Sequence, residues 1–178
     1  MRSGRKSGLL WTALKTLAFA AVVPGTVTIA APFLLLSSRP EAGHFSSLPL
    51  QIVGAFAICL GALAGGWCFW LFVFEGKGTP APIDPPKMLV VSGPYRFVRN
   101  PMYLAVTTIL LGESAFFGSG ALLLYAGLCL IGFNLFVRFY EEPALRRKFG
   151  PAYDEHCRTV SRWIPGRQTA RPKNSPPH

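Results

Sequence analysis

Charged side chains are scarce in this sequence, and acidic ones are the scarcest. Only 15% of the 178 residues are charged, eight of them acidic and eighteen basic, whereas 51% are hydrophobic. Soluble domains carry about 25% charged residues. The composition therefore argues against a single soluble domain and indicates that the bilayer is the solvent for most of the chain.

Cysteine and histidine are also few and scattered. The four cysteines show neither the spacing of metal ligands nor a disulfide framework, and we interpret them as buried apolar residues. None of the three histidines is placed as an obvious general base, and no metal site is expected. Without repeats or a long polar stretch, residues 1–165 are predicted to form one membrane domain, followed by a disordered basic tail over 166–178.

Long apolar runs predict the fold. A helix needs about 20 mostly apolar residues to cross the hydrocarbon core, and such runs cover residues 9–36, 48–74 and 102–140. The last run is long enough for two crossings, and the turn sequence at 117–120 divides it into 102–116 and 121–140. The sequence therefore predicts an all-α integral membrane bundle of four transmembrane helices, in which the third and fourth form a short helical hairpin.

Basic residues are distributed asymmetrically about these spans. They flank the first span, follow the second and fill the region from Arg138 to Lys173, whereas only Arg39 falls on the other side. The positive-inside rule then places both termini and the loop 75–100 in the cytoplasm. The pattern favours a membrane over nucleic acid as the reason for the formal charge of +10. Alternatively, the first span is a cleaved signal peptide, although it exceeds the usual h-region of about 7–15 residues.

Two adjacent glutamates, Glu141 and Glu142, lie where the last apolar run meets the basic tail. With Asn134 and Arg138 they occupy helix positions i, i+4, i+7 and i+8, which places all four on one face. A polar stripe in a membrane helix should face protein or a water-filled pocket. In the alternative reading, Arg138 pairs with Glu142 and Asn134 bonds a neighbouring helix, which leaves Glu141 unexplained.

A second polar element precedes the third span. Asn100 followed by Pro101 predicts a helix start, because asparagine is a good N-cap and proline suits the first helical position. The positive end of this helix, with Arg99 beside it, would form an anion site, although arginine here would equally serve as a membrane anchor. Asn100 and Tyr103 share a helix face that is expected to meet the Asn134 stripe.

Three further segments carry weaker signals. Glu113, near the outer end of the third span, is interpreted as a snorkelling or helix-packing carboxylate. The proline-rich loop 76–86 should be extended. Apolar residues recur at roughly helical spacing from Leu145 to Trp163 among basic residues, which predicts an amphipathic interfacial segment, broken near Gly150-Pro151, that closes over the glutamates.

Together these features predict a cytoplasmic pocket with an anion-binding half and a carboxylate half. Such a pocket suits a ligand of mixed charge. S-adenosylmethionine fits this description, because its carboxylate seeks arginine or a helix N-terminus while its amino group, hydroxyls and sulfonium seek carboxylates and carbonyls.

The same motifs, in the same order, resemble those of the isoprenylcysteine carboxyl methyltransferase and phospholipid methyltransferase superfamily. They are Gly76-Lys77-Gly78-Thr79-Pro80-Ala81-Pro82, Gly93-Pro94-Tyr95-Arg96, Arg99-Asn100-Pro101-Met102-Tyr103, and Glu141-Glu142 followed by Leu145, Phe149-Gly150 and Tyr153. The resemblance covers roughly residues 50–165. It implies a membrane-embedded methyltransferase whose cofactor, S-adenosylmethionine, is held by the last two helices and their flanking segments.

Carried over by motif position, the resemblance implies a set of cofactor ligands: Arg99, Asn100, Pro101, Tyr103, Glu141 and Glu142, with Tyr95, Gly76 and Gly78 beside them. Glu141, Arg99 and Asn100 are the candidate catalytic residues. Asn100 stands where many relatives have histidine. Asparagine cannot titrate near neutral pH, so a proton-transfer role there is in doubt, while hydrogen bonding to the cofactor remains feasible.

The expected methyl acceptor is a membrane-soluble or small apolar molecule: an isoprenylcysteine-like carboxylate, a phospholipid amine or a thiol. Two alternatives stay open. A sterol-reductase-like enzyme would use the nicotinamide cofactor NADPH and need more spans than this chain offers. A non-catalytic membrane scaffold would use the polar stripe only to pair helices.

Overall fold

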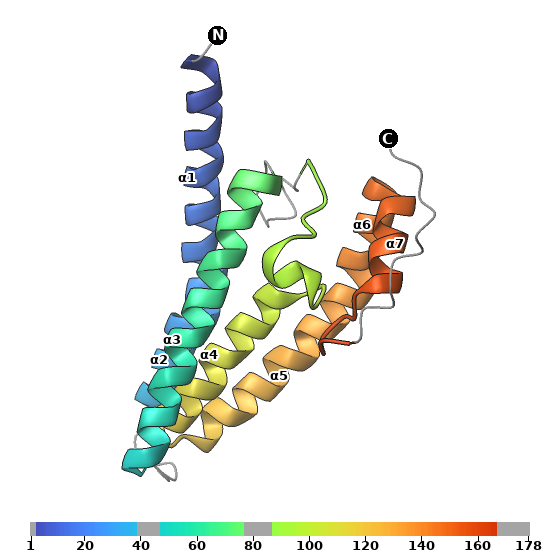
Figure 1. Ribbon diagram of the computed structural model, residues 1–178. Helices are drawn as coiled ribbons and strands as arrows, with labels where there is room; N and C mark the ends of the chain where they lie inside the picture. Colours follow the sequence, from blue (N-terminus) through green and yellow to red (C-terminus); the bar gives the residue numbers. More distant parts are fainter. Residues whose placement is uncertain (1–2, 39–46, 77–86, 167–178) are drawn as a thin grey trace.

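The described part of the chain is built from helices joined by short loops (Figure 1). The computed structural model describes residues 3–38, 47–76 and 87–166. These ranges contain no β-strand, and an isolated parallel bridge joins Val98 to Ser161. The segment between the first two predicted spans, the proline-rich loop and the basic tail fall largely outside the described residues.

Three helices are long and apolar enough to cross a membrane: Leu14–Ser38, Leu48–Gly76 and Gly120–Phe149. The first long helix consists of α1 (Ser3–Gly25), η1 (Thr26–Ala30) and α2 (Ala31–Ser38). The second consists of α3 (Leu48–Leu71) and η2 (Phe72–Gly76). The third consists of α5 (Gly120–Phe136), η4 (Val137–Glu141) and α6 (Glu142–Phe149). A fourth apolar helix, α4 (Pro101–Phe117), is shorter. The prediction of a helical membrane domain is confirmed, and the last long helix continues past residue 140, where the predicted span ends.

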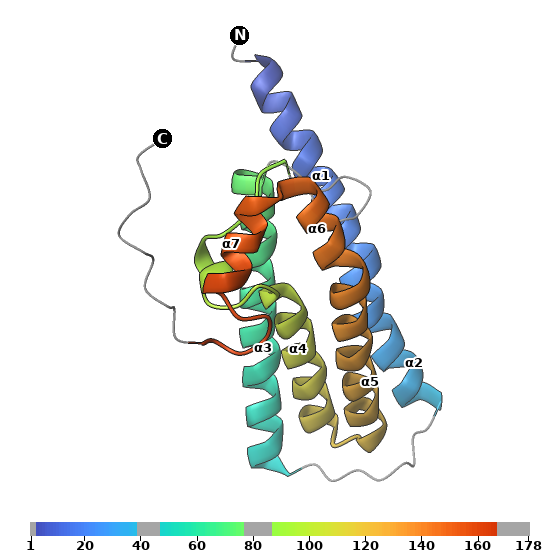
Figure 2. The ribbon, with the colours of Figure 1, turned by 90° about the vertical axis from the view of Figure 1, so that its right-hand side faces the viewer.

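Glycines allow α3 and α4 to approach closely. A Cβ added at Gly54 would lie 2.6 Å from the carbonyl oxygen of Gly112, and one added at Gly61 would lie 2.7 Å from that of Ala105. Residues with higher numbers on α3 therefore contact residues with lower numbers on α4, which means that the two helices run antiparallel (Figure 2). Small residues serve this purpose in membrane helices, where van der Waals packing and not the hydrophobic effect holds neighbours together.

A tight turn joins α4 to α5. Gly118 has a φ of 61°, in the left-handed region that glycine adopts without strain. The Ser114 hydroxyl donates to the carbonyl oxygen of Ser119 at 3.0 Å, and the Ser119 hydroxyl in turn accepts from the N–H of Leu122. The expected turn is thus present, closed by two serines.

Two of the long helices contain a π turn followed at once by a proline. At the end of η4 the N–H of Glu142 bonds the carbonyl of Val137, and Pro143 follows; Pro32 follows η1 in the same way. Proline lacks an N–H and its ring clashes with the preceding turn, which widens the helix locally. The extra residue in the η4 turn changes which face Glu142 occupies relative to Asn134.

The chain reverses beyond α6. Gly150, with a φ of 50°, separates α6 from α7 (Pro151–Thr159), where the sequence predicts a break. In Figure 2, α7 lies in front of the bundle between α3 and α6. This packing brings the residues after α7 to the end of the bundle at which α4 begins.

The glycine contact generates a prediction about stability. Alanine is the better helix former by about 1 kcal/mol, so Gly127→Ala on α5, where an added Cβ meets nothing within 4 Å, should be neutral or stabilising. At Gly112 the added Cβ would lie 2.8 Å from the Gly54 carbonyl oxygen, and Gly112→Ala should instead destabilise the protein by about 1–3 kcal/mol. Denaturation of both variants in detergent tests this. Equal effects would contradict the close approach.

Candidate functional site

The loop before α4 is fixed at both of its ends. At its start, the N–H groups of Lys87 and Met88 donate to the carbonyl oxygen of Gly76, at the end of η2. At its end, the N–H of Arg99 donates to the carbonyl oxygen of Ser161 at 2.9 Å. The start of α4 is therefore held between α3 and the residues that follow α7.

Tyr95 anchors the middle of this loop. It lies in the short 3₁₀ helix η3 (Gly93–Arg96), buried in a cluster with Cys68, Leu71 and Val90, and its ring meets the edge of Phe72 at 5.7 Å. Burial raises the pKa of Tyr95 well above its usual range, and the nearby Cys68 and Glu141 raise it further. Tyr95 is thus a neutral, buried group within electrostatic range of Glu141.

Helix α4 begins at Pro101, as the sequence predicts, with Asn100 in the N-cap position. The Asn100 side chain does not cap the helix. Its Nδ2 donates instead to the carbonyl oxygen of Arg162 at 3.3 Å. The helix start therefore contributes a side-chain contact to the C-terminal region.

Glu142 is the centre of the charged network. Its carboxylate accepts hydrogen bonds from Arg99 Nη1 at 3.0 Å, from Arg162 Nε at 2.7 Å and from Arg162 Nη2 at 2.9 Å. The side chains of Arg99 and Glu142 are only 12% and 5% exposed. A buried carboxylate needs such partners, because charge is poorly solvated in a low-dielectric interior. The hydrogen bond to Glu142 also raises the pKa of Arg162.

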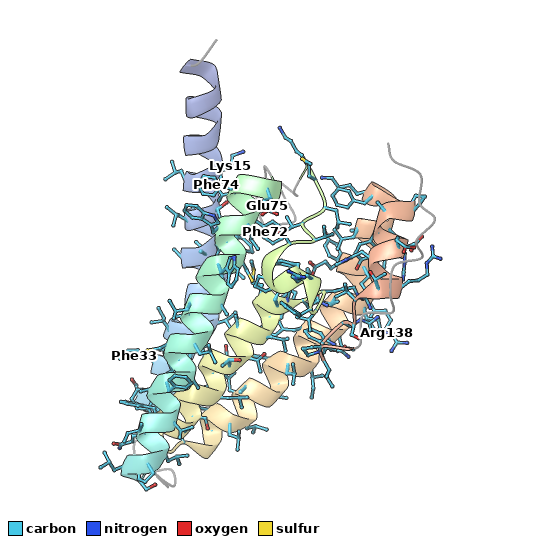
Figure 3. The ribbon with its side chains drawn as sticks, in the orientation of Figure 1. Lys15, Phe33, Phe72, Phe74, Glu75 and Arg138 are labelled. Carbon is cyan, nitrogen blue, oxygen red and sulfur yellow. The ribbon has the colours of Figure 1, made fainter. Side chains whose placement is uncertain are left out.

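The alternative reading, in which Arg138 pairs with Glu142, is wrong. Among the described residues the ion pairs of Glu142 are with Arg99 and Arg162, while Arg138 is exposed and lies over the ring of Phe139 at 5.9 Å. Figure 3 shows Arg138 on the outer side of the bundle. The π turn η4 explains the difference, because its extra residue breaks the α-helical spacing on which the expectation depended.

Glu141 meets the other half of the site. Tyr103, on the first turn of α4, donates its hydroxyl proton to Glu141 Oε2 at 2.8 Å. The Tyr103 ring also packs against Phe133 at 5.0 Å and Trp163 at 6.4 Å. Within the described residues, Glu141 Oε1 forms no hydrogen bond. The face of α4 and the face of α5 therefore meet as expected, and one carboxylate oxygen remains available.

Residues 160–163, which we call the strap, lie across the site. Ser161 accepts the Arg99 N–H, Arg162 binds Glu142, and Trp163 Nε1 donates to Asn134 Oδ1 at 3.0 Å. The sequence predicts an amphipathic segment closing over the glutamates, and these contacts confirm the closure. It does not single out Arg162 and Trp163 as site residues, since the one signal for them is their place at the end of the amphipathic pattern.

Arg99 has unused hydrogen-bonding capacity. Its Nη1 contacts Glu142 and, at 2.8 Å, the sulfur of Cys157. Its Nε is buried and has no hydrogen-bond partner in the described part of the chain. Buried donors are almost always paired, so this N–H is a candidate point of contact for an acceptor.

The structure brings five of the candidate residues together: Arg99, Asn100, Tyr103, Glu141 and Glu142. Pro101 contributes the helix start between them. Gly76 lies at the opposite end of the loop that carries Tyr95, and Gly78 is outside the described residues.

His156 generates a prediction about pH. Burial, and then the charge of Arg99, lower its pKa below the usual 6.5. The unfolded chain therefore binds more protons than the folded one below about pH 6.5, so stability should fall as the pH drops through this range. In thermal melts between pH 5 and 8, His156→Gln should remove this part of the slope. An unchanged slope in the variant would contradict a neutral, buried His156.

A comparison with known families identifies the family of the chain. The phospholipid methyltransferase family matches residues 50–152, more than half of the chain. The match includes α3, α4, α5 and the paired glutamates, whereas the strap lies beyond it. No curated protein and no solved structure matches the chain. With its apolar helices and its two-part site, the chain belongs to the phospholipid methyltransferase family of membrane methyltransferases.

Proposed function

We propose that this protein is an S-adenosylmethionine-dependent methyltransferase whose cofactor pocket lies between the start of α4 and the paired glutamates. The observation that carries the proposal is the buried Nε of Arg99, which has no hydrogen-bond partner among the described residues. A buried donor without an acceptor is costly. A carboxylate satisfies a guanidinium particularly well, and the cofactor carries one, so the residues present fit it.

Glu141 supplies the complementary half of the proposed pocket. Its Oε2 is bound by Tyr103, while its Oε1, which has no hydrogen bond to a described residue, can accept one from an ammonium or hydroxyl group. The cofactor has both groups. The positive end of the α4 dipole, beginning at Asn100 and Pro101, adds a favourable field for the carboxylate. Tyr95, Gly76 and Gly78 belong to the proposed site on the resemblance alone.

When bound, the cofactor supplies a methyl group already activated by its sulfonium. The task left to the chain is to hold both reactants in line and to exclude water. The strap supports the second role, because Trp163 and Arg162 tie it across the site. Asn100 cannot accept a proton, which favours an acceptor that is already anionic.

The proposed acceptor comes from the membrane. Candidates are an isoprenylcysteine-like carboxylate, a thiol or a phospholipid amine, and of these the thiol and the amine must also lose a proton. We further propose that α4 crosses the membrane as a fourth span, paired with α5 in a hairpin, and that both termini and the strap face the cytoplasm, following the positive-inside rule.

Glu141 provides the sharpest test of this proposal. Hydrogen bonds to charged groups contribute about 1.5–3 kcal/mol, so Glu141→Gln should weaken binding of S-adenosylmethionine and its demethylated product by about tenfold or more. Glu75→Gln is the matched control. Glu75 lies on η2, accepts a hydrogen bond from the Ser92 hydroxyl and is not one of the candidate site residues. Calorimetry on the detergent-purified protein measures both.

Two results would overturn the proposal. One is that the intact protein binds neither ligand, and the other is that it binds reduced nicotinamide cofactor in their place. A Glu141→Gln affinity equal to that of the Glu75→Gln control would remove Glu141 from the proposed site. Thermal melts of each variant establish that the fold is retained.

A further inference from the structure

An apolar pocket of about 240 Å³ lies between the first long helix, α3 and α4. Its lining includes Pro24, Thr28, Gly61, Gly66, Met102 and Ile109. Gly66 on α3 leaves space open, since a Cβ added there would meet nothing within 4 Å. The charged network around Glu142 contributes no residue to this lining.

Glu113 continues the face of α4 that lines this pocket. Met102, Ala105 and Ile109 share that face, and Glu113 follows Ile109 by one helical turn. The carboxyl oxygen Oε2 of Glu113 is buried and has no hydrogen-bond partner in the described part of the chain. Burying an ionisable group in an apolar helix costs free energy. Such a group is therefore by default a candidate functional residue.

A donor close to Glu113 already has another partner. Tyr125 on α5 lies within electrostatic range of Glu113, but its hydroxyl donates to the carbonyl oxygen of Val27 at 3.1 Å. Val27 precedes Thr28, which lines the pocket, so this hydrogen bond lies next to the pocket lining, as Glu113 does one turn beyond Ile109. The single hydroxyl proton of Tyr125 is given to Val27, and among the described residues Glu113 Oε2 has no hydrogen-bond partner.

We propose that Glu113 is the polar end of a lipid-binding pocket and takes the hydroxyl group of an otherwise apolar, elongated molecule. A hydroxyl can donate a hydrogen bond to Oε2 of Glu113, the carboxyl oxygen that has no partner among the described residues. The apolar part then lies along α4 toward Met102, a distance of about 16 Å at 1.5 Å per residue. This site is independent of methyl transfer, and its ligand need not be the methyl acceptor.

Photo-crosslinking tests the proposal on the full-length protein in lipid nanodiscs. The probes are dodecan-1-ol carrying a mid-chain diazirine and the methyl ether of the same molecule. Because a hydrogen bond to the carboxyl is open to the alcohol as a donor and not to the ether, the alcohol should label peptides of α3 and α4 about fivefold more. Glu113→Leu should abolish this preference, whereas Glu113→Gln should keep part of it.

Two controls separate the carboxyl from the pocket. Thr108→Val removes a polar group from α4. The Thr108 hydroxyl already donates to the Leu104 carbonyl oxygen, so this variant should leave the preference for the alcohol over the ether unchanged. Gly66→Leu fills open space in the pocket and should reduce labelling by both probes. Equal labelling of the intact protein by alcohol and ether, stronger labelling by the corresponding amine, or a preference that survives Glu113→Leu would overturn the proposal.

Discussion

The carboxylate of Glu142 is held between Arg99 and Arg162, and the geometry of the site depends on this three-residue network. Arg99 precedes α4, Glu142 opens α6 and Arg162 lies on the strap, so the network joins segments far apart in the sequence. A buried ion pair is weak evidence for net stability, but removing one partner leaves an uncompensated charge that costs about 3–5 kcal/mol. The network therefore constrains where these segments can lie.

The two glutamates have different partners in this network. Glu142 is engaged with two arginines, whereas Glu141 holds Tyr103 with one oxygen, and its other oxygen has no hydrogen bond to a described residue. Among the described residues the Nε of Arg99 also has no partner. An unused donor and an unused acceptor at one end of the bundle suit a ligand that carries both charges. Away from this charged end of the bundle, glycine contacts join α3 to α4, and an apolar pocket lies beside them.

Much of the fold could be predicted because its signals are local. Apolar runs specify the helices, Asn100-Pro101 specifies where α4 begins, and Gly150 specifies the break before α7. The meeting of Tyr103 with Glu141 also follows from helical spacing and a short turn. Each of these inferences needs only a few neighbouring residues.

The partners of Glu142 could not be predicted in this way. Ideal α-helical spacing favours Arg138, and the π turn before Pro143 changes that spacing. Arg162 is 20 residues from Glu142, so their pairing depends on the reversal at Gly150 and on how α7 packs. The bond of Trp163 to Asn134 has the same origin. Long-range contacts of this kind leave no periodic signal in a single sequence.

A double-mutant cycle between Glu142 and Arg162 tests the central claim most directly. The measurement is the free energy of unfolding in detergent for the intact protein, Glu142→Gln, Arg162→Met and the double variant. If this pair holds the strap over the site, the double variant should be less destabilised than the sum of the single variants, with a coupling energy of about 2 kcal/mol or more. Effects that add to within about 0.5 kcal/mol would contradict the account.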